Sequence, residues 1–271
     1  MPGGAAPAGR LRPMYRFLWK PKWIVSHVAV LALIVSMILL MFWQLRRLDE
    51  KKELNARIAA RADGAPAQLV DVLDDERIRT TADGDRVEYR SVVVTGTYDT
   101  AAEFTIPNRT LDGAPGRFVV TPLRYAPDRP AILVLRGFLP QSIQDDTPPI
   151  EGAEPPSGEV QVRGWLRVAE LPGAFQGKDV DLGDNRVARF DIDRIAAARK
   201  LDLAPVYLEL GAQAPATAGE ALTPYPLPER SEGPHFSYAV QWAIFTLIAI
   251  GGYPLVLRRV ARGGSAGKDD L

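Results

Sequence analysis

The chain lacks cysteine, and its 271 residues include only two histidines. Without cysteine there can be no disulfide, thiolate metal site or thiol chemistry, although this absence does not identify a compartment. The two histidines, His27 and His235, lie near opposite ends of the chain, so a hydrolase triad would find no imidazole base between them. No glycine loop of the phosphate-cradling type is present either. The sequence therefore predicts that the protein is not an enzyme.

Charged residues are absent from two stretches, residues 23–44 and 236–257. About 20 apolar residues, rising about 1.5 Å each, cross a hydrocarbon core of about 30 Å. We therefore expect a membrane protein in which two transmembrane α-helices flank a domain of residues 45–235. No small-residue cleavage site follows the first stretch, which favours an uncleaved signal anchor over a removed signal peptide.

Basic residues are concentrated in the two tails, residues 1–22 and 258–271, whereas the middle of the chain is acidic. Positive flanks stay in the cytoplasm, so both termini are expected inside and the middle domain outside. Four basic residues after the first stretch oppose this orientation, but both tails agree with it: Arg46, Arg47, Lys51 and Lys52. The bias toward Ala, Gly, Pro, Arg and Asp favours a bacterial plasma membrane. No basic face points to nucleic acid.

The middle segment changes from helical to strand periodicity. Helical spacing over residues 46–61 ends at an Asp-Gly-Ala-Pro sequence, and residues 69–79 favour a second short helix. Runs rich in β-branched residues predict strands at 91–98, 103–106, 117–125, 131–138, 159–168 and 206–210, with a helix at 191–201. We expect an exported, β-rich α+β domain whose antiparallel sheet curls or closes into a barrel. Residues 211–234, rich in Pro and Ala, are expected to be a linker.

The second apolar stretch begins with a histidine among aromatic residues. A helix that starts near His235 places Tyr238 and Trp242 on the same face. The outer end of the first stretch brings Trp43 and Gln44 to the same depth. An imidazole beside apolar walls at the membrane surface could ligate a porphyrin iron. The alternative is an aromatic belt in which the histidine only forms hydrogen bonds.

Two other groups of residues have plainer interpretations. His27 adjoins a stripe of small residues that favours packing against a partner helix, comprising Ser26, Ala29, Ala32 and Ser36. Two acidic pairs could bind a hard cation but are expected to be solvated loops, namely Asp74–Asp75 and Asp145–Asp146.

Five short motifs, in order along the chain, resemble signatures of the Surfeit locus protein 1 family. They are Phe-Trp-Gln-Leu-Arg-Arg at 42–47, Val-Thr-Gly-Thr-Tyr at 94–98, Asn-Arg at 108–109 followed by Gly113, Gly116 and Val-Val-Thr-Pro-Leu at 119–123, Arg-Gly-Phe-Leu-Pro at 136–140, and His-Phe-Ser-Tyr-Ala-Val-Gln-Trp at 235–242. Leu135 departs from the family, which commonly has Asn at that position.

The resemblance implies an assembly factor for haem–copper cytochrome c oxidase that helps to place haem a into the catalytic subunit. It matches His235 to the candidate haem ligand, so that the expected cofactor site comprises His235, Tyr238, Trp242, Trp43 and Gln44. The expected partners are the oxidase catalytic subunit, the haem a synthesis machinery and membrane lipid. Two alternatives stay open: a scaffold or accessory subunit of the oxidase that never touches haem, and an exported-domain enzyme.

Two arginines of these motifs, Arg109 and Arg136, could pair either with acids of the domain or with haem propionates. We expect acid pairing, because a guanidinium fork commonly ties carboxylates and carbonyls together.

Overall fold

The computed structural model describes residues 17–143, 148, 150–171, 173, 180–183, 185–217 and 219–266. The acidic pair Asp145–Asp146 and the outermost parts of both tails lie outside the described residues. The chain forms two compact units, one made of residues 1–55 and 231–271 and the other of residues 56–230.

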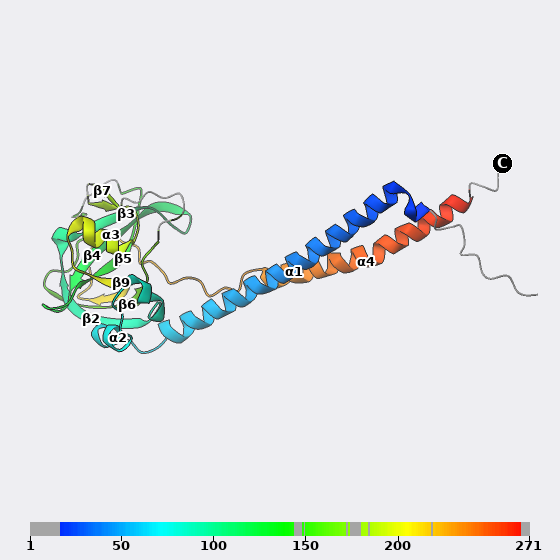
Figure 1. Ribbon diagram of the computed structural model, residues 1–271. Coiled ribbons are helices and arrows are strands. Elements are labelled where there is room, and N and C mark those ends of the chain that lie inside the picture. Colours follow the sequence, from blue (N-terminus) through cyan, green and yellow to red (C-terminus); the bar gives the residue numbers. More distant parts are fainter. Residues whose placement is uncertain are drawn as a thin grey trace, which may run out of the picture. The chain divides into compact units, whose positions relative to one another are not determined.

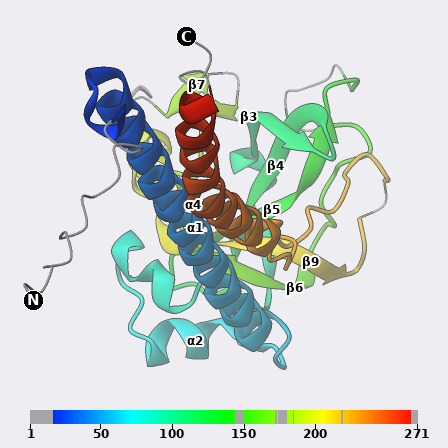
Figure 2. The same ribbon diagram turned by 90° about the vertical axis from the view of Figure 1, so that its right-hand side faces the viewer.

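The first unit is built on two long helices, α1 (Pro21–Ala62) and α4 (His235–Ala266), which lie side by side (Figures 1 and 2). Both are long and apolar enough to cross a membrane. Most of their large apolar side chains, such as Leu31 and Leu247, are exposed. Apolar helices that bury so little against protein need another apolar medium, and a bilayer provides one. Their insertion into a membrane stays a prediction.

Helix α1 continues without a break through the charged residues after the first apolar stretch. It ends at Ala62, directly before Asp63 and Gly64, so the expected helical extension and its end are both confirmed. Helix α4 also continues through Pro254, beyond the apolar stretch, to Ala266. Both helices therefore exceed the length that a bilayer core requires.

The second unit contains a closed ring of five strands. They are β2 (Ser91–Tyr98), β4 (Ala114–Arg124), β5 (Ala131–Pro140), β6 (Glu159–Arg167) and β9 (Leu203–Ala214). They pair in the order β2–β6–β9–β5–β4, and a further pairing of β4 with β2 closes the ring. The expected barrel is thereby confirmed. The expectation of a purely antiparallel sheet is wrong, because β5 and β9 pair in parallel. The long connection between them, which contains β6, permits a parallel crossover.

Smaller elements extend and cover this ring. Short or outer strands are β1 (Ala67–Gln68), β3 (Phe104–Leu111), β7 (Asp181–Gly183) and β8 (Arg186–Val187). Short helices are α2 (Leu69–Asp75), α3 (Ile192–Arg199), and two 3-10 turns, η2 (Thr81–Arg86) and η3 (Thr100–Ala102). The pairings β1–β2 and β3–β8 are also parallel, so the sheet is mixed.

The predicted elements agree closely with the observed ones where β-branched residues are dense. The strand at 91–98 has its predicted bounds, and those at 117–125, 131–138 and 159–168 are confirmed within three residues at either end. The expected strand at 103–106 extends to Leu111. Strand β9 runs to Ala214, four residues into the segment expected to be a linker, because these residues pair with β6.

The barrel interior is filled by one hydrophobic cluster with members from all five strands, including Val94, Leu123, Val134, Val162 and Leu208. Two glycines mark places where neighbouring backbones come very close. A Cβ on Gly96 would lie 2.4 Å from the Arg124 carbonyl oxygen, and one on Gly164 would lie 2.0 Å from that of Glu209. Gly96 belongs to the Val-Thr-Gly-Thr-Tyr motif, so its role there is close strand packing.

Candidate functional site

The candidate ligand His235 is the first residue of α4, and its ring is held by α1. Its Nδ1 lies 2.8 Å from Oε1 of Gln44, across the pair of helices. A carboxamide oxygen can only accept a hydrogen bond, so Nδ1 carries the proton and donates it. When the ring carries only this proton, its lone pair is on Nε2. This is the form in which a histidine ligates a metal ion.

The Nε2 edge of the His235 ring is not engaged by any described residue. Gly233 lies beside that edge: a Cβ there would be 3.4 Å from Cδ2 and 3.6 Å from Nε2 of the ring. Gly233 also has a φ of 66°, a left-handed conformation that favours glycine. Gly233, two residues before the helix, therefore approaches the nitrogen that could bind iron without a side chain of its own.

The other predicted site residues lie in the first turns of α4 and near the middle of α1. Tyr238 and Trp43 are 46% and 47% exposed, and Trp242 is half-buried against Phe245 in an edge-to-face contact of 6.1 Å between centroids. Among the described residues, no hydrogen bond or ring contact joins these three to His235. The structure thus brings His235 and Gln44 together and leaves the aromatic side chains available to an apolar ligand or to lipid.

The second histidine has a matching arrangement at the other end of the helix pair. His27 Nδ1 lies 2.6 Å from the Tyr253 hydroxyl, which donates in turn to Ser26 Oγ at 3.0 Å. The stripe containing Ser26 was expected to pack against a partner helix, and at this position that partner is α4. Tyr253 was not anticipated from the sequence, because no periodicity distinguishes it from an interfacial aromatic residue.

The motif arginines pair with acids, as expected. Arg109 donates to both carboxylate oxygens of Glu170 at 2.8 and 2.6 Å. Arg136 Nη1 lies 3.0 Å from Oε2 of Glu103, which also accepts from Thr121 Oγ1 at 2.6 Å. The Arg136 and Glu103 side chains are 0% and 2% exposed. A guanidinium enclosed to this degree is inaccessible to a haem propionate, so its role in this structure is to tie strands together.

A second buried ionic group was not found from the sequence. Arg167 Nη1 donates to Oε2 of Glu209 at 2.9 Å, and its guanidinium lies over the Tyr89 ring, 4.6 Å from the centroid. The Glu209 side chain is 1% exposed, and its Oε1 has no hydrogen-bond partner among the described residues. Burial raises the pKa of Glu209 to about 7, although Arg167 opposes the shift.

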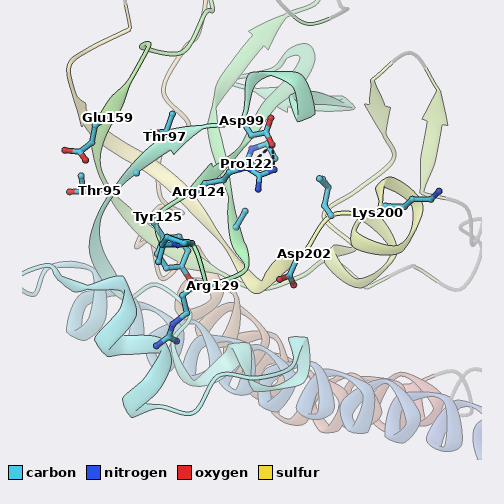
Figure 3. A pocket seen from close by; sticks show the side chains of 15 residues that line it. Thr95, Thr97, Asp99, Pro122, Arg124, Tyr125, Arg129, Glu159, Lys200 and Asp202 are labelled. Atoms are coloured by element: carbon cyan, nitrogen blue, oxygen red, sulfur yellow. Dashed lines mark hydrogen bonds and ion pairs between the residues drawn. The ribbon is translucent and has the colours of Figure 1, made fainter.

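The barrel unit has several surface cavities. One of about 640 Å³ is lined by residues of both charges, including Arg124, which pairs with Asp99 at 2.6 Å (Figure 3). Arg129, also on its lining, donates to both oxygens of Asp74, and this lowers the Asp74 pKa to about 2. Asp74 is thus neutralised by arginine, and no group of acids or histidines suited to a metal ion occurs among the residues described.

Fold and site together define a class: a closed barrel whose sequence lies between two helices of membrane-spanning length, with a histidine of one helix bonded to a glutamine of the other. The chain belongs to the SURF1 family, whose model matches residues 31–247. This family is generally one of cytochrome oxidase assembly factors. The expected membership of the Surfeit locus protein 1 family is thereby confirmed.

Individual relatives support the assignment across kingdoms. A SURF1-like protein of Mycobacterium tuberculosis, described as uncharacterized, is 26% identical over 238 residues, which cover 88% of this chain and 84% of the relative. A SURF1-like protein of Monosiga brevicollis is 27% identical over 235 residues, covering 80% of this chain and 82% of the relative. Both matches extend over most of each protein.

The elevated pKa of Glu209 predicts how stability depends on pH. The folded protein binds the Glu209 proton more tightly than the unfolded chain does. Protonated Glu209 therefore adds to the free energy of unfolding in full below pH 4.5, and this stabilisation is lost as pH rises through about 7. The total change is on the order of 3 kcal/mol of unfolding free energy. Denaturant unfolding of the purified chain in detergent, from pH 4.5 to 8, should show this fall.

Glu209→Gln should remove that fall, because the amide does not titrate. Glu159→Gln, at an exposed position on β6, is the matched control and should keep it. An unchanged pH dependence in Glu209→Gln would show that Glu209 ionises in the folded protein as it does in the unfolded chain.

Proposed function

We propose that this protein is an assembly factor for haem–copper cytochrome c oxidase that handles haem a and passes it to the catalytic subunit. The observation that carries the proposal is the His235 ring, fixed through Nδ1 by Gln44 and unengaged at Nε2. Membership of a family of oxidase assembly factors supplies the biological context. The proposal assigns no catalytic step to the protein.

The residues around His235 suit a haem group. A protein holds haem through an axial ligand and apolar surfaces beside the ring, and the iron can accept the lone pair of an imidazole nitrogen. His235 would provide that nitrogen, and Gln44 would hold the imidazole. The exposed rings of Tyr238 and Trp43, with Trp242, would provide the apolar surface. Aromatic rings that would otherwise face lipid or water gain contact area when they cover a macrocycle.

The arrangement also suits temporary binding. One histidine offers iron a single protein ligand, and the His235 ring is only half-buried. A site that is open on one side can release its ligand without local unfolding of the protein. Transfer to an oxidase subunit requires such release, whereas a permanent haem protein gains from enclosing the group on both faces.

We propose further that the protein lies in a bacterial plasma membrane, with both termini in the cytoplasm and the barrel unit outside. The basic tails support this orientation. The haem a synthesis machinery and the oxidase catalytic subunit would then be partners in the same membrane. A haem site at His235, on the side of the helix pair at the start of α4, suits the transfer of haem between proteins that share a bilayer.

Reporter fusions test the orientation. A reporter that is active only outside the cytoplasm should be active when fused after Arg167, which ends β6, and inactive when fused at Leu271. The physical reason is that positively charged flanks are retained on the cytoplasmic side. Reporter activity in the reverse pattern would place His235 on the cytoplasmic side of the membrane and contradict the proposed topology.

Haem retention tests the function of the site. His235→Ala should abolish bound haem in protein purified from cells that make haem a, because the axial nitrogen is lost. Trp242→Ala should reduce retention partially, since it removes apolar surface and no ligand. Soret and α-band absorbance per mole of protein measures both effects.

His27→Ala is the matched control, because it also removes a histidine whose Nδ1 is bonded across the same helix pair. It should keep the haem content of the parent. Haem retained in full by His235→Ala would refute ligation by this residue, and a parent without haem would favour the scaffold interpretation.

A further inference from the structure

We infer that Gln44 is a positioning residue that fixes His235 in the tautomer required to bind iron. The inference rests on the proposed function, since it concerns the same haem site. Gln44 itself would not bind the metal. Its contribution is to determine which of the two imidazole nitrogens carries the proton and which has the free lone pair.

The geometry limits what Gln44 can do. Its Oε1 lies 2.8 Å from Nδ1, so it receives the Nδ1 proton and leaves Nε2 unprotonated. The reverse arrangement, in which the carboxamide NH₂ donates to Nδ1, would put the proton on Nε2. That nitrogen could not then bind iron. On the Nε2 side of the ring, the nearby Gly233 has no side chain, and no described residue forms a hydrogen bond to Nε2.

The bond also constrains the direction of the ring. Gln44 lies on α1 and His235 is the first residue of α4, where no preceding helical turn packs against its side chain. A hydrogen bond from outside its own helix is therefore needed to hold the imidazole plane. Partners that orient a metal-binding histidine in this way commonly raise metal affinity about 10–100-fold.

A simpler explanation is that Gln44 only joins the two helices. The chain contains its own control for this, because His27 Nδ1 and the Tyr253 hydroxyl form an equivalent bond between the same helices at 2.6 Å. If helix pairing were the whole role of Gln44, then removing the Tyr253 hydroxyl should weaken haem binding as much as removing the Gln44 carboxamide.

The experiment compares the full-length parent with Gln44→Leu, Gln44→Glu and Tyr253→Phe, each purified without haem and titrated with haem in detergent. Gln44→Leu should bind haem about 10–100-fold more weakly. Gln44→Glu keeps an acceptor at the same position and should restore affinity. Its carboxylate makes the ring a stronger donor to iron, so the midpoint potential of the bound haem should fall. Tyr253→Phe should bind like the parent.

A second readout needs no haem. Because the chain has only two histidines, ¹⁵N-histidine labelling gives just two imidazole spin systems to assign. At a pH where both rings are neutral, His235 should be protonated on Nδ1 in the parent and in Gln44→Glu. In Gln44→Leu it should lose this preference, while Tyr253→Phe should change the ring of His27 alone.

Three results would overturn the inference while leaving haem binding by His235 intact. They are an Nε2-protonated His235 in the parent, equal haem affinity in the parent and Gln44→Leu, and an equal loss of affinity in Gln44→Leu and Tyr253→Phe. Failure of every protein, including the parent, to bind haem would overturn the proposed function, and the inference with it.

Discussion

The hydrogen bond between His235 Nδ1 and Gln44 Oε1 joins residues that are 191 positions apart in the chain. It can form only because the two apolar helices lie side by side, and the proposed haem chemistry depends on it. At the other end of the pair, His27 makes the corresponding bond to Tyr253. In a bilayer, side chains of this kind must find partners within the protein, since lipid tails offer none. The two histidines are thus constrained alike, and they differ in the groups that hold them: a carboxamide at His235 and a tyrosine hydroxyl at His27.

The barrel unit satisfies its polar groups in a different way. Closing the ring of β2, β6, β9, β5 and β4 removes free strand edges from the barrel itself. Within the unit, arginines pair with buried carboxylates: Arg136 with Glu103, and Arg167 with Glu209. Such pairs add little net stability, because desolvation offsets much of their attraction. Their main effect is to favour one arrangement of the strands over others.

Much of the fold, and part of the candidate site, could be predicted from the sequence. Residues without charge over the length of a bilayer marked both helices, and the β-branched run Ser91–Tyr98 gave β2 its exact bounds. The parallel pairing of β5 and β9 could not be foreseen, because it depends on contacts between distant segments. The pairing of His235 with Gln44 could have been predicted, since the sequence already placed both residues at the same depth in the membrane. The partners of Glu209 and His27 were not, because a single buried Glu or Tyr carries no periodic signal.

The most direct test of the account is genetic complementation. In a strain lacking this gene, the haem a absorbance of assembled oxidase in isolated membranes would be measured after returning the parent, His235→Ala or His27→Ala gene. The account predicts that the parent and His27→Ala restore the oxidase, whereas His235→Ala, present in the membrane in equal amount, does not. Full restoration by His235→Ala would contradict the claim that this protein serves oxidase assembly by holding haem at His235.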